Sequence, residues 1–353
     1  MRVKAFFLLV LLGTIAGLCA SPLKPDETVI FFPSHASRIS SNSWRLDIRG
    51  WIFEPERRPG VATAFRKALS LDQESLSREE QAILASRTKL FLVDSERNKR
   101  LSIEIGDKVY QLTPSDDNGH FRTLLEVAAA RMPQLSNNIV SFRAVTQPGD
   151  ERIFTGIIYL VEPQGLTVVS DIDDTIKITE VLSRRSALLN TFAREFRPVP
   201  GMTDLYRRWA ADSAIHFHYL SASPGQLYPP LAEFLQSNRF PPGSVHLRAF
   251  DSKKEILRLT SPTKYKPFII EDLLLRYPER RFVLVGDSGE MDPEIYGDIA
   301  RKYPGRVEKI FIRDVTGERG PSPRYAQAFQ GVAEQVWEIF VEPGEISWSP
   351  AGK

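Results

Sequence analysis

The sequence predicts two domains of different architecture, a β-rich domain followed by an α/β domain with a parallel sheet. Residues 27–163 contain short extended runs separated by turn residues, whereas residues 164–345 alternate apolar runs with amphipathic stretches. The chain has 353 residues, of which 42% are hydrophobic and 25% are charged. This length and composition are typical of a globular protein with two domains.

Residues 1–20 are predicted to be a secretory signal peptide. Two basic residues precede an apolar stretch at residues 5–18, and small and polar residues follow it. The stretch is shorter than the roughly 20 apolar residues that a membrane-spanning helix needs. We therefore expect cleavage near Ala20 and export to the periplasm or out of the cell.

Cys19, the single cysteine, allows a second interpretation of this segment, in which it becomes the lipid-modified first residue of a lipoprotein. Leu18 argues against this, because the processing prefers a small residue before the cysteine. One cysteine cannot form an intramolecular disulfide, so no structural disulfides are expected. The formal net charge of only +2 argues against broad nucleic-acid binding.

Residues 27–163 are predicted to form a small, sandwich-like β domain with a helical insertion. Between Glu54 and Arg87, apolar residues recur near helical spacing, which predicts two short helices. The predicted strands are Thr28–Phe32, Trp44–Phe53, Lys89–Val93, Leu101–Ile105, Lys108–Leu112, Asn138–Val145 and Arg152–Leu160.

Residues 164–345 are predicted to form a parallel sheet covered by helices on both faces. The predicted strands are Leu166–Ser170, Ala214–Leu220, Val245–Phe250, Arg281–Val285 and Val307–Ile312. The predicted helices are Asp204–Ala211, Leu227–Gln236, Lys266–Arg276 and Pro293–Tyr303. Ligands of such sheets bind beyond the carboxyl ends of the strands.

Two carboxylates, Asp171 and Asp173, directly follow the first of these strands. Residues two apart leave a strand end in the same direction, so one carboxylate can attack while the other moves protons. An anionic phosphomonoester resists attack by a bare carboxylate, so this chemistry requires a divalent cation, and Mg²⁺ suits an all-oxygen site. An acidic turn that caps the next helix is an equally good interpretation of this motif alone.

Further polar residues follow the other strands and the start of a helix. Ser221 and free backbone N–H groups could bind a phosphate oxygen, and Asp287 and Asp292 could complete a cation site. A lysine near Lys266 could bind the phosphoryl group. Turn and cap roles, or simple solvation of the lysine, explain each of these residues equally well in isolation.

Taken together, these motifs resemble the haloacid-dehalogenase-like phosphatases. The segments 170–177, 219–229 and 286–296 resemble more closely the phosphatidate phosphatases of the actin-patch-protein type, which are relatives of the lipins. The segment 50–56 is similar to the accessory domain of that family. The resemblance implies a Rossmann-like haloacid-dehalogenase core with a small cap insertion.

The resemblance also implies roles for individual residues. Asp171 would be the nucleophile that forms an aspartyl-phosphate, and Asp173 the general acid and then the general base. The implied Mg²⁺ ligands are Asp171, the backbone carbonyl of Asp173, Asp287 and Asp292. The implied substrate-binding residues are Ser221, Lys266 and Thr175, with Thr175 orienting the loop. Lys266 is preferred to Lys264 because apolar residues follow it at helical spacing, and Lys254 is a third candidate.

Residues 177–203 leave room for a small cap. Within them, basic residues surround Leu188, Leu189, Phe192 and Phe196, so a helix there would suit an anionic membrane surface. The alternative is that this apolar side packs on the protein. The five histidines show no spacing typical of metal ligands.

The leading hypothesis is a Mg²⁺-dependent phosphatidate phosphatase, which releases diacylglycerol and phosphate. The alternatives are a phosphatase for soluble phosphomonoesters and a catalytically silent lipid-binding module. The presence of both Asp171 and Asp173 argues against the silent module.

Overall fold

The computed structural model describes residues 21–55, 76–132, 138–211, 214–248, 264–319 and 322–350. The predicted signal peptide with Cys19, the first of the two predicted inserted helices and Lys254 lie outside these residues. Among the helices of the described residues, none combines the length and the apolar character needed to cross a membrane.

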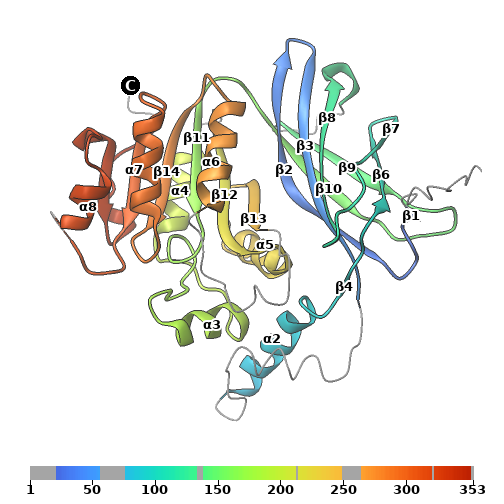
Figure 1. Cartoon of the computed structure of the whole chain (residues 1–353), viewed down its shortest axis with the longest axis horizontal. Helices are drawn as coiled ribbons and strands as arrows, with labels where there is room; N and C mark the ends of the chain where they lie inside the picture. The colour runs from blue at the N-terminus through green and yellow to red at the C-terminus, as the bar shows by residue number, and fades with distance from the viewer. Residues whose placement is uncertain are drawn as a thin grey trace, which may run out of the picture.

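The C-terminal domain is built on a six-stranded sheet in which all neighbouring strands run parallel (Figure 1). The strands are β11 (Leu166–Asp171), β12 (Ile215–Pro224), β13 (Gly243–Arg248), β14 (Arg281–Asp287), β15 (Val307–Arg313) and β16 (Trp337–Phe340). Their order across the sheet is β13-β12-β11-β14-β15-β16, which is the doubly wound order 3-2-1-4-5-6. The predicted parallel sheet is confirmed.

Helices cover both faces of this sheet. The adjacent residues Val168 and Val169 are both fully buried, because they point to opposite faces and belong to two different apolar clusters. One cluster contains α4 (Met202–Trp209) and α5 (Tyr228–Ser237). The other contains α6 (Tyr265–Arg276), α7 (Asp292–Lys302) and α8 (Pro323–Ala328). The sequence analysis did not predict α8 or β16.

The N-terminal domain is β-rich, but its main strands form one sheet and not the two packed sheets of a sandwich. The order is β4-β3-β2-β10-β9-β6-β7, and β8 also pairs with β3. The strands are β2 (Thr28–Ser40), β3 (Ser43–Glu54), β4 (Asp94–Ser95), β6 (Ser102–Ile105), β7 (Lys108–Gln111), β8 (His120–Ala128), β9 (Ile139–Val145) and β10 (Thr155–Val161), with β1 (Ser21–Pro22) and β5 (Lys99–Arg100) as a separate pair. The pairing of β2 with β3 shifts register after Phe32, so this long hairpin bends and the sheet curves around one core.

The predicted strand Lys89–Val93 is wrong. The second inserted helix, α2 (Arg78–Lys89), extends to Lys89. A capping box between Ser77 and Glu80 defines its start, and basic residues in its last turn favour its end. The chain then turns and pairs with β3 only at Asp94–Ser95. The sequence analysis also missed β8, which runs along most of β3.

The region predicted to be a cap contains one short helix, α3 (Arg184–Phe192). Its residues Leu189 and Phe192 are buried in a cluster with Leu84 of α2. Arg194, just after the helix, pairs with Glu80 of α2, with 2.9 Å between Nε and Oε1. The apolar side of α3 therefore packs against the inserted helix, and the interpretation of this side as a membrane-binding face is wrong.

Candidate active site

The candidate site lies where the strand order of the parallel sheet reverses. β11 is the first strand of the domain, and its neighbours β12 and β14 leave it in opposite directions across the sheet. Asp171 is the last residue of β11 and Asp287 is the last residue of β14. These two strands are hydrogen-bonded neighbours, so their carboxyl ends bring the two carboxylates together at the position where doubly wound sheets bind ligands.

Three buried carboxylates, those of Asp171, Asp287 and Asp292, form the centre of the site. One oxygen atom from each lies within 4.8 Å of the others. Asp292 is the first residue of α7 and approaches the β14 backbone closely, because a Cβ atom on Gly286 would lie 2.3 Å from its Oδ2 atom. Glycine at position 286 thus permits the third carboxylate to join the cluster.

Lys266 is the positive charge of this cluster and is fully buried. Its Nζ atom lies 2.7 Å from Oδ1 of Asp171, 2.6 Å from Oδ1 of Asp292 and 2.9 Å from Oε2 of Glu290. These carboxylates raise the pKa of Lys266 well above its ordinary value, although burial acts in the opposite direction. The lysine therefore stays charged.

Burial and mutual repulsion disfavour the ionised form of the carboxylates in the cluster. Burial raises the pKa of Asp171 and that of Asp287 well above the ordinary value, and the neighbouring carboxylates add to both shifts. Lys266 opposes these shifts but cannot neutralise four carboxyl groups. In the described part of the chain, Oδ2 of Asp287 has no hydrogen-bond partner. An excess of buried carboxylates with a free oxygen atom is the donor set that a divalent cation such as Mg²⁺ prefers.

Asp173 lies in a different environment, on the loop after β11. Its Oδ1 atom is 2.7 Å from Nζ of Lys177, and its Oδ2 atom accepts hydrogen bonds from Ser221 at 2.8 Å and Ser223 at 3.1 Å. Burial raises the pKa of Asp173, but Lys177 and hydrogen bonds from Ser221 and Thr179 outweigh it, so the pKa lies below its ordinary value. Asp173 is therefore ionised in this structure.

Asp174 and Thr175 shape the loop that carries these residues. The φ angle of Asp174 is 54°, and its carboxylate accepts hydrogen bonds from the backbone N–H groups of Thr179, Glu180 and Val181. Asp174 therefore stabilises the loop and does not face the carboxylate cluster. Thr175 donates a hydrogen bond of 3.2 Å to Oδ2 of Asp171, so it orients the carboxylate directly.

The structure brings the predicted site residues together at one edge of the sheet. Of the predicted lysines, Lys266 lies in the cluster, whereas Lys264 is exposed at the start of α6. Asp173 contributes no side-chain oxygen to the group of three carboxylates, which is compatible with the backbone oxygen that the resemblance implied.

Sequence reasoning assigned no role to four residues that contact the site: Lys177, Thr179, Ser223 and Glu290. Each lies within six residues of a predicted site residue. The available signal was their closeness in the sequence to the predicted site residues. This closeness did not show which of the four side chains would face the carboxylates.

The fold and the site define an α/β domain with a cluster of buried carboxylates at the carboxyl ends of its central strands. Residues 166–314 match the family described as phosphatidate phosphatase APP1, catalytic domain. This part of the chain is similar to that catalytic domain, and the resemblance predicted from the sequence is confirmed for it. The match does not extend to the β-rich domain, so its similarity to the family's accessory domain stays a prediction.

Two curated relatives are similar to part of this chain. Phosphatidate phosphatase APP1 of Saccharomyces cerevisiae is 31% identical over 192 residues, which cover 54% of this chain and 32% of the yeast protein. An uncharacterized protein of Schizosaccharomyces pombe is 30% identical over 168 residues, which cover 45% of this chain and 27% of that protein. The chain thus spans about a third or less of the length of these relatives.

Among solved structures, a 2,6-sialyltransferase of Photobacterium sp. JT-ISH-224 is 12% identical, with 62% of this chain and 37% of that chain covered. Its TM-score is 0.21, which is too low to support a shared fold.

Proposed function

We propose that the protein is a divalent-metal-dependent phosphatidate phosphatase of the haloacid-dehalogenase type, which releases diacylglycerol and phosphate. The observation that carries the proposal is the cluster of Asp171, Asp287 and Asp292 with the buried Lys266 at the switch point of the sheet. The match of residues 166–314 to the catalytic domain of phosphatidate phosphatase APP1 supports the substrate class.

The residues of the cluster fit a Mg²⁺ ion. Asp171, Asp287 and Asp292 would hold it, together with the backbone oxygen of Asp173. When bound, the ion would neutralise negative charge on the phosphoryl group and the attacking carboxylate. The free Oδ2 atom of Asp287 and the surplus of buried carboxylates over Lys266 support this assignment.

In the first chemical step, a carboxylate oxygen of Asp171 attacks phosphorus, and the bond to the glycerol oxygen breaks. Thr175 holds Asp171 from one side and Lys266 from the other. The leaving oxygen takes a proton from Asp173. Asp173 is ionised in this structure, so the entering phosphate must first raise its pKa. It does so by adding negative charge beside Asp173 and by engaging Ser221 and Lys177 as partners of its own.

In the second step, a water molecule attacks the aspartyl-phosphate, and Asp173 accepts a proton from it. The ionised state of Asp173, which Lys177 favours, suits this role as a base. Asp171 is restored and phosphate is released. The same carboxylate thus acts as acid and base in turn, with its pKa set by whether a phosphate dianion lies beside it.

A lipid substrate requires contact with a membrane or micelle surface. The apolar side of α3 is packed against α2, so we assign this contact to exposed residues around the start of α3. Leu182 is 62% exposed, and Arg184 and Arg185 beside it are also exposed. An apolar residue next to basic ones suits an anionic surface. We further propose that the chain is exported, on the basis of residues 1–20.

The test compares wild type with Asp171→Asn for phosphate release from phosphatidate in mixed micelles containing Mg²⁺. We expect the variant to lose at least about 1,000-fold in kcat, because the nucleophile is removed. Asp298→Asn is the matched control, since this side chain is 79% exposed. Undiminished turnover by Asp171→Asn would refute the mechanism.

The same preparation distinguishes the alternatives. Faster turnover of small water-soluble phosphomonoesters than of phosphatidate would replace the lipid assignment by a soluble-substrate phosphatase. Lipid binding without turnover of either substrate class would identify a silent binding module.

A further inference from the structure

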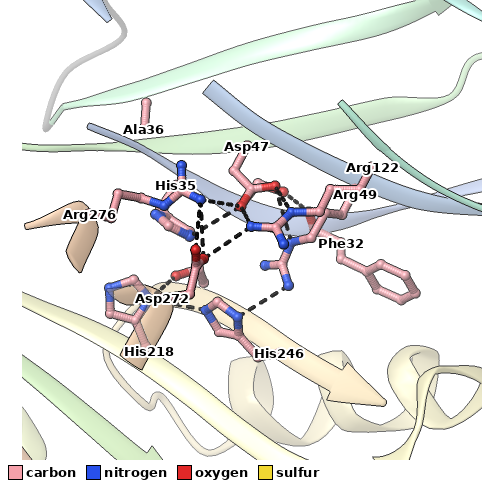
Figure 2. A network of polar contacts seen from close by, with 12 residues as sticks. Phe32, His35, Ala36, Asp47, Arg49, Arg122, His218, His246, Asp272 and Arg276 are labelled. Atoms are coloured by element: carbon pink, nitrogen blue, oxygen red, sulfur yellow. Dashed lines mark hydrogen bonds and ion pairs between the residues drawn. The ribbon is translucent and has the colours of Figure 1, made fainter. Parts of the chain in front are cut away.

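Three of the five histidines meet where the two domains contact each other (Figure 2). His35 comes from β2 of the β-rich domain, whereas His218 and His246 come from β12 and β13 of the parallel sheet. Their exposed fractions are 0%, 0% and 3%. The sequence analysis found no metal-ligand spacing because these residues lie far apart in the chain. The cluster is also separate from the carboxylates of the candidate active site.

The three rings face one another at distances suited to a shared ion. Their centroids are 5.0 Å apart for His35 and His218, 5.6 Å for His35 and His246, and 5.3 Å for His218 and His246. One nitrogen atom from each ring lies within 4.8 Å of the others. Nδ1 of His218 is 3.1 Å from Nε2 of His246. Two imidazole nitrogens on one tetrahedral Zn²⁺ ion lie about 3.3 Å apart, given Zn–N bonds of about 2.0 Å.

His35 offers a free nitrogen to this group. Its Nδ1 atom is 2.5 Å from the hydroxyl of Tyr277, and that hydroxyl in turn lies 3.4 Å from the backbone oxygen of Ala36, to which it donates. In the tautomer with the proton on Nδ1, Tyr277 accepts that proton and donates its own to Ala36, and Nε2 carries the lone pair. Among the residues that the structure describes, Nε2 of His35 has no hydrogen-bond partner. The nearest carboxylate oxygen, Oδ2 of Asp47, is 3.8 Å away.

We infer that His35, His218 and His246 bind one divalent transition-metal ion, Zn²⁺ being the best match, and that this ion joins the two domains. Asp47 or a water molecule would complete the coordination. Without the ion, Nδ1 of His218 lies near two partners, Nε2 of His246 at 3.1 Å and Oγ of Ser244 at 2.6 Å. Among the described residues, Nε2 of His35 stays buried without a hydrogen-bond partner. An ion bound at Nδ1 of His218 replaces the contact with Ser244 and gives His35 a partner.

The charges around the cluster decide which class of metal it can take. Arg49, Arg122 and Arg276 face it, as Figure 2 shows, and among the residues that the structure describes Asp47 and Asp272 offset them. Mg²⁺ and Ca²⁺ bind through charge and oxygen ligands, so this excess of positive charge disfavours them. Neutral imidazole nitrogens instead suit Zn²⁺, Cu²⁺ and Ni²⁺, whose bonds to nitrogen do not depend on an anionic site.

The protonation state of the three histidines suits metal coordination. Burial lowers the pKa of each of them well below its ordinary value, and nearby arginines add to the shift for His35 and His246. They are therefore neutral, which is the state that binds metal. Binding at Nε2 of His246 places the proton on Nδ1, so Arg49 must give up its 3.2 Å contact there. Arg49 keeps its bond to the backbone oxygen of Val245.

The experiment first removes metal from the full chain with a chelator and dialyses the protein against millimolar Mg²⁺, which occupies the acidic site. It then measures the binding of added Zn²⁺. We expect one tightly bound Zn²⁺ per chain and a higher Tm when it binds. His35→Gln should weaken binding by about 100-fold or more and abolish the rise in Tm. The matched control is His216→Gln. His216 is half-buried on the same strand as His218 and, among the described residues, belongs to no group that could hold a metal ion, so Zn²⁺ affinity should stay within about threefold of wild type.

A measurement on the wild type avoids variants that fail to fold. X-ray absorption at the zinc edge should show three imidazole ligands. Zinc surrounded only by oxygen ligands would overturn the inference, because it would assign the ion to the carboxylates. No binding of added zinc, or equal binding by wild type and His35→Gln, would overturn it as well.

Discussion

The buried Lys266 allows a direct test of the electrostatics of the candidate site through stability alone. Its side chain is fully buried and lies within 2.9 Å of three carboxyl groups, those of Asp171, Glu290 and Asp292. Substitution by methionine keeps most of the volume and removes the charge. The carboxylates then remain buried beside one another without a cation.

The expected cost follows from the loss of one partner of a buried ion pair. Such a loss destabilises a protein by about 3–5 kcal/mol, since the remaining charge is left uncompensated. A change of 1 kcal/mol shifts the Tm of a domain of 150–250 residues by roughly 2–4 °C, so Lys266→Met should lower the Tm of the α/β domain by roughly 6–20 °C.

The assay is thermal and urea unfolding of wild type and Lys266→Met without added metal. Lys264→Met is the control, because Lys264 is exposed two residues earlier and its loss should change the free energy of unfolding by about 0.5 kcal/mol or less. If Lys266→Met unfolds within about 1 kcal/mol of the control, Lys266 does not compensate the carboxylates and the account of the site is refuted.

Two further predictions concern the framework around the site. Arg280 is 2% exposed and donates hydrogen bonds to backbone oxygens between the domains, including that of Glu162 at 2.9 Å. Arg280→Met should therefore destabilise the protein by about 3–5 kcal/mol in urea unfolding, and an effect no larger than that of the half-exposed Arg281→Met would contradict this. Burial raises the pKa of Tyr159 to about 12, so the unfolded chain loses this proton first and stability falls as the pH rises above 10. Between pH 9 and pH 11, Tyr159→Phe should lose about 1.3 kcal/mol less stability than wild type, and equal losses would show that Tyr159 is not the cause.

The sequence was sufficient to predict the parallel sheet and most of the candidate site. The runs before Asp171 and Asp287 are apolar without alternation, which is expected only of strands covered on both faces. Because such strands end at one edge of the sheet, motifs far apart in the chain could be placed together before any contact was known. Lys266 could be preferred to Lys264 for a similar reason, since its spacing to later apolar residues placed it on the buried side of a helix.

What the sequence did not show depends on contacts between elements whose relative placement no local pattern encodes. The apolar side of α3 looks the same whether it meets lipid or α2, and only the structure shows that Leu84 covers it. The single sheet of the β-rich domain depends on a bulge after Phe32, where Pro33 ended the predicted strand although β2 continues to Ser40. The meeting of His35 with His246 requires the docking of two domains.

That docking has a consequence for the candidate active site. Strand β12 carries His218 at the contact between the domains and, three residues later, Ser221, which donates a hydrogen bond to Asp173. The contact includes the buried polar residues His35, Asp47 and His246, which tolerate little displacement because a shift removes their partners. The ion pair of Arg122 with Asp272 of α6, with 3.1 Å between its atoms, fixes the helix that carries Lys266 to the same domain. The β-rich domain therefore supports two of the elements that position the site, and its orientation is part of what holds the catalytic groups in place.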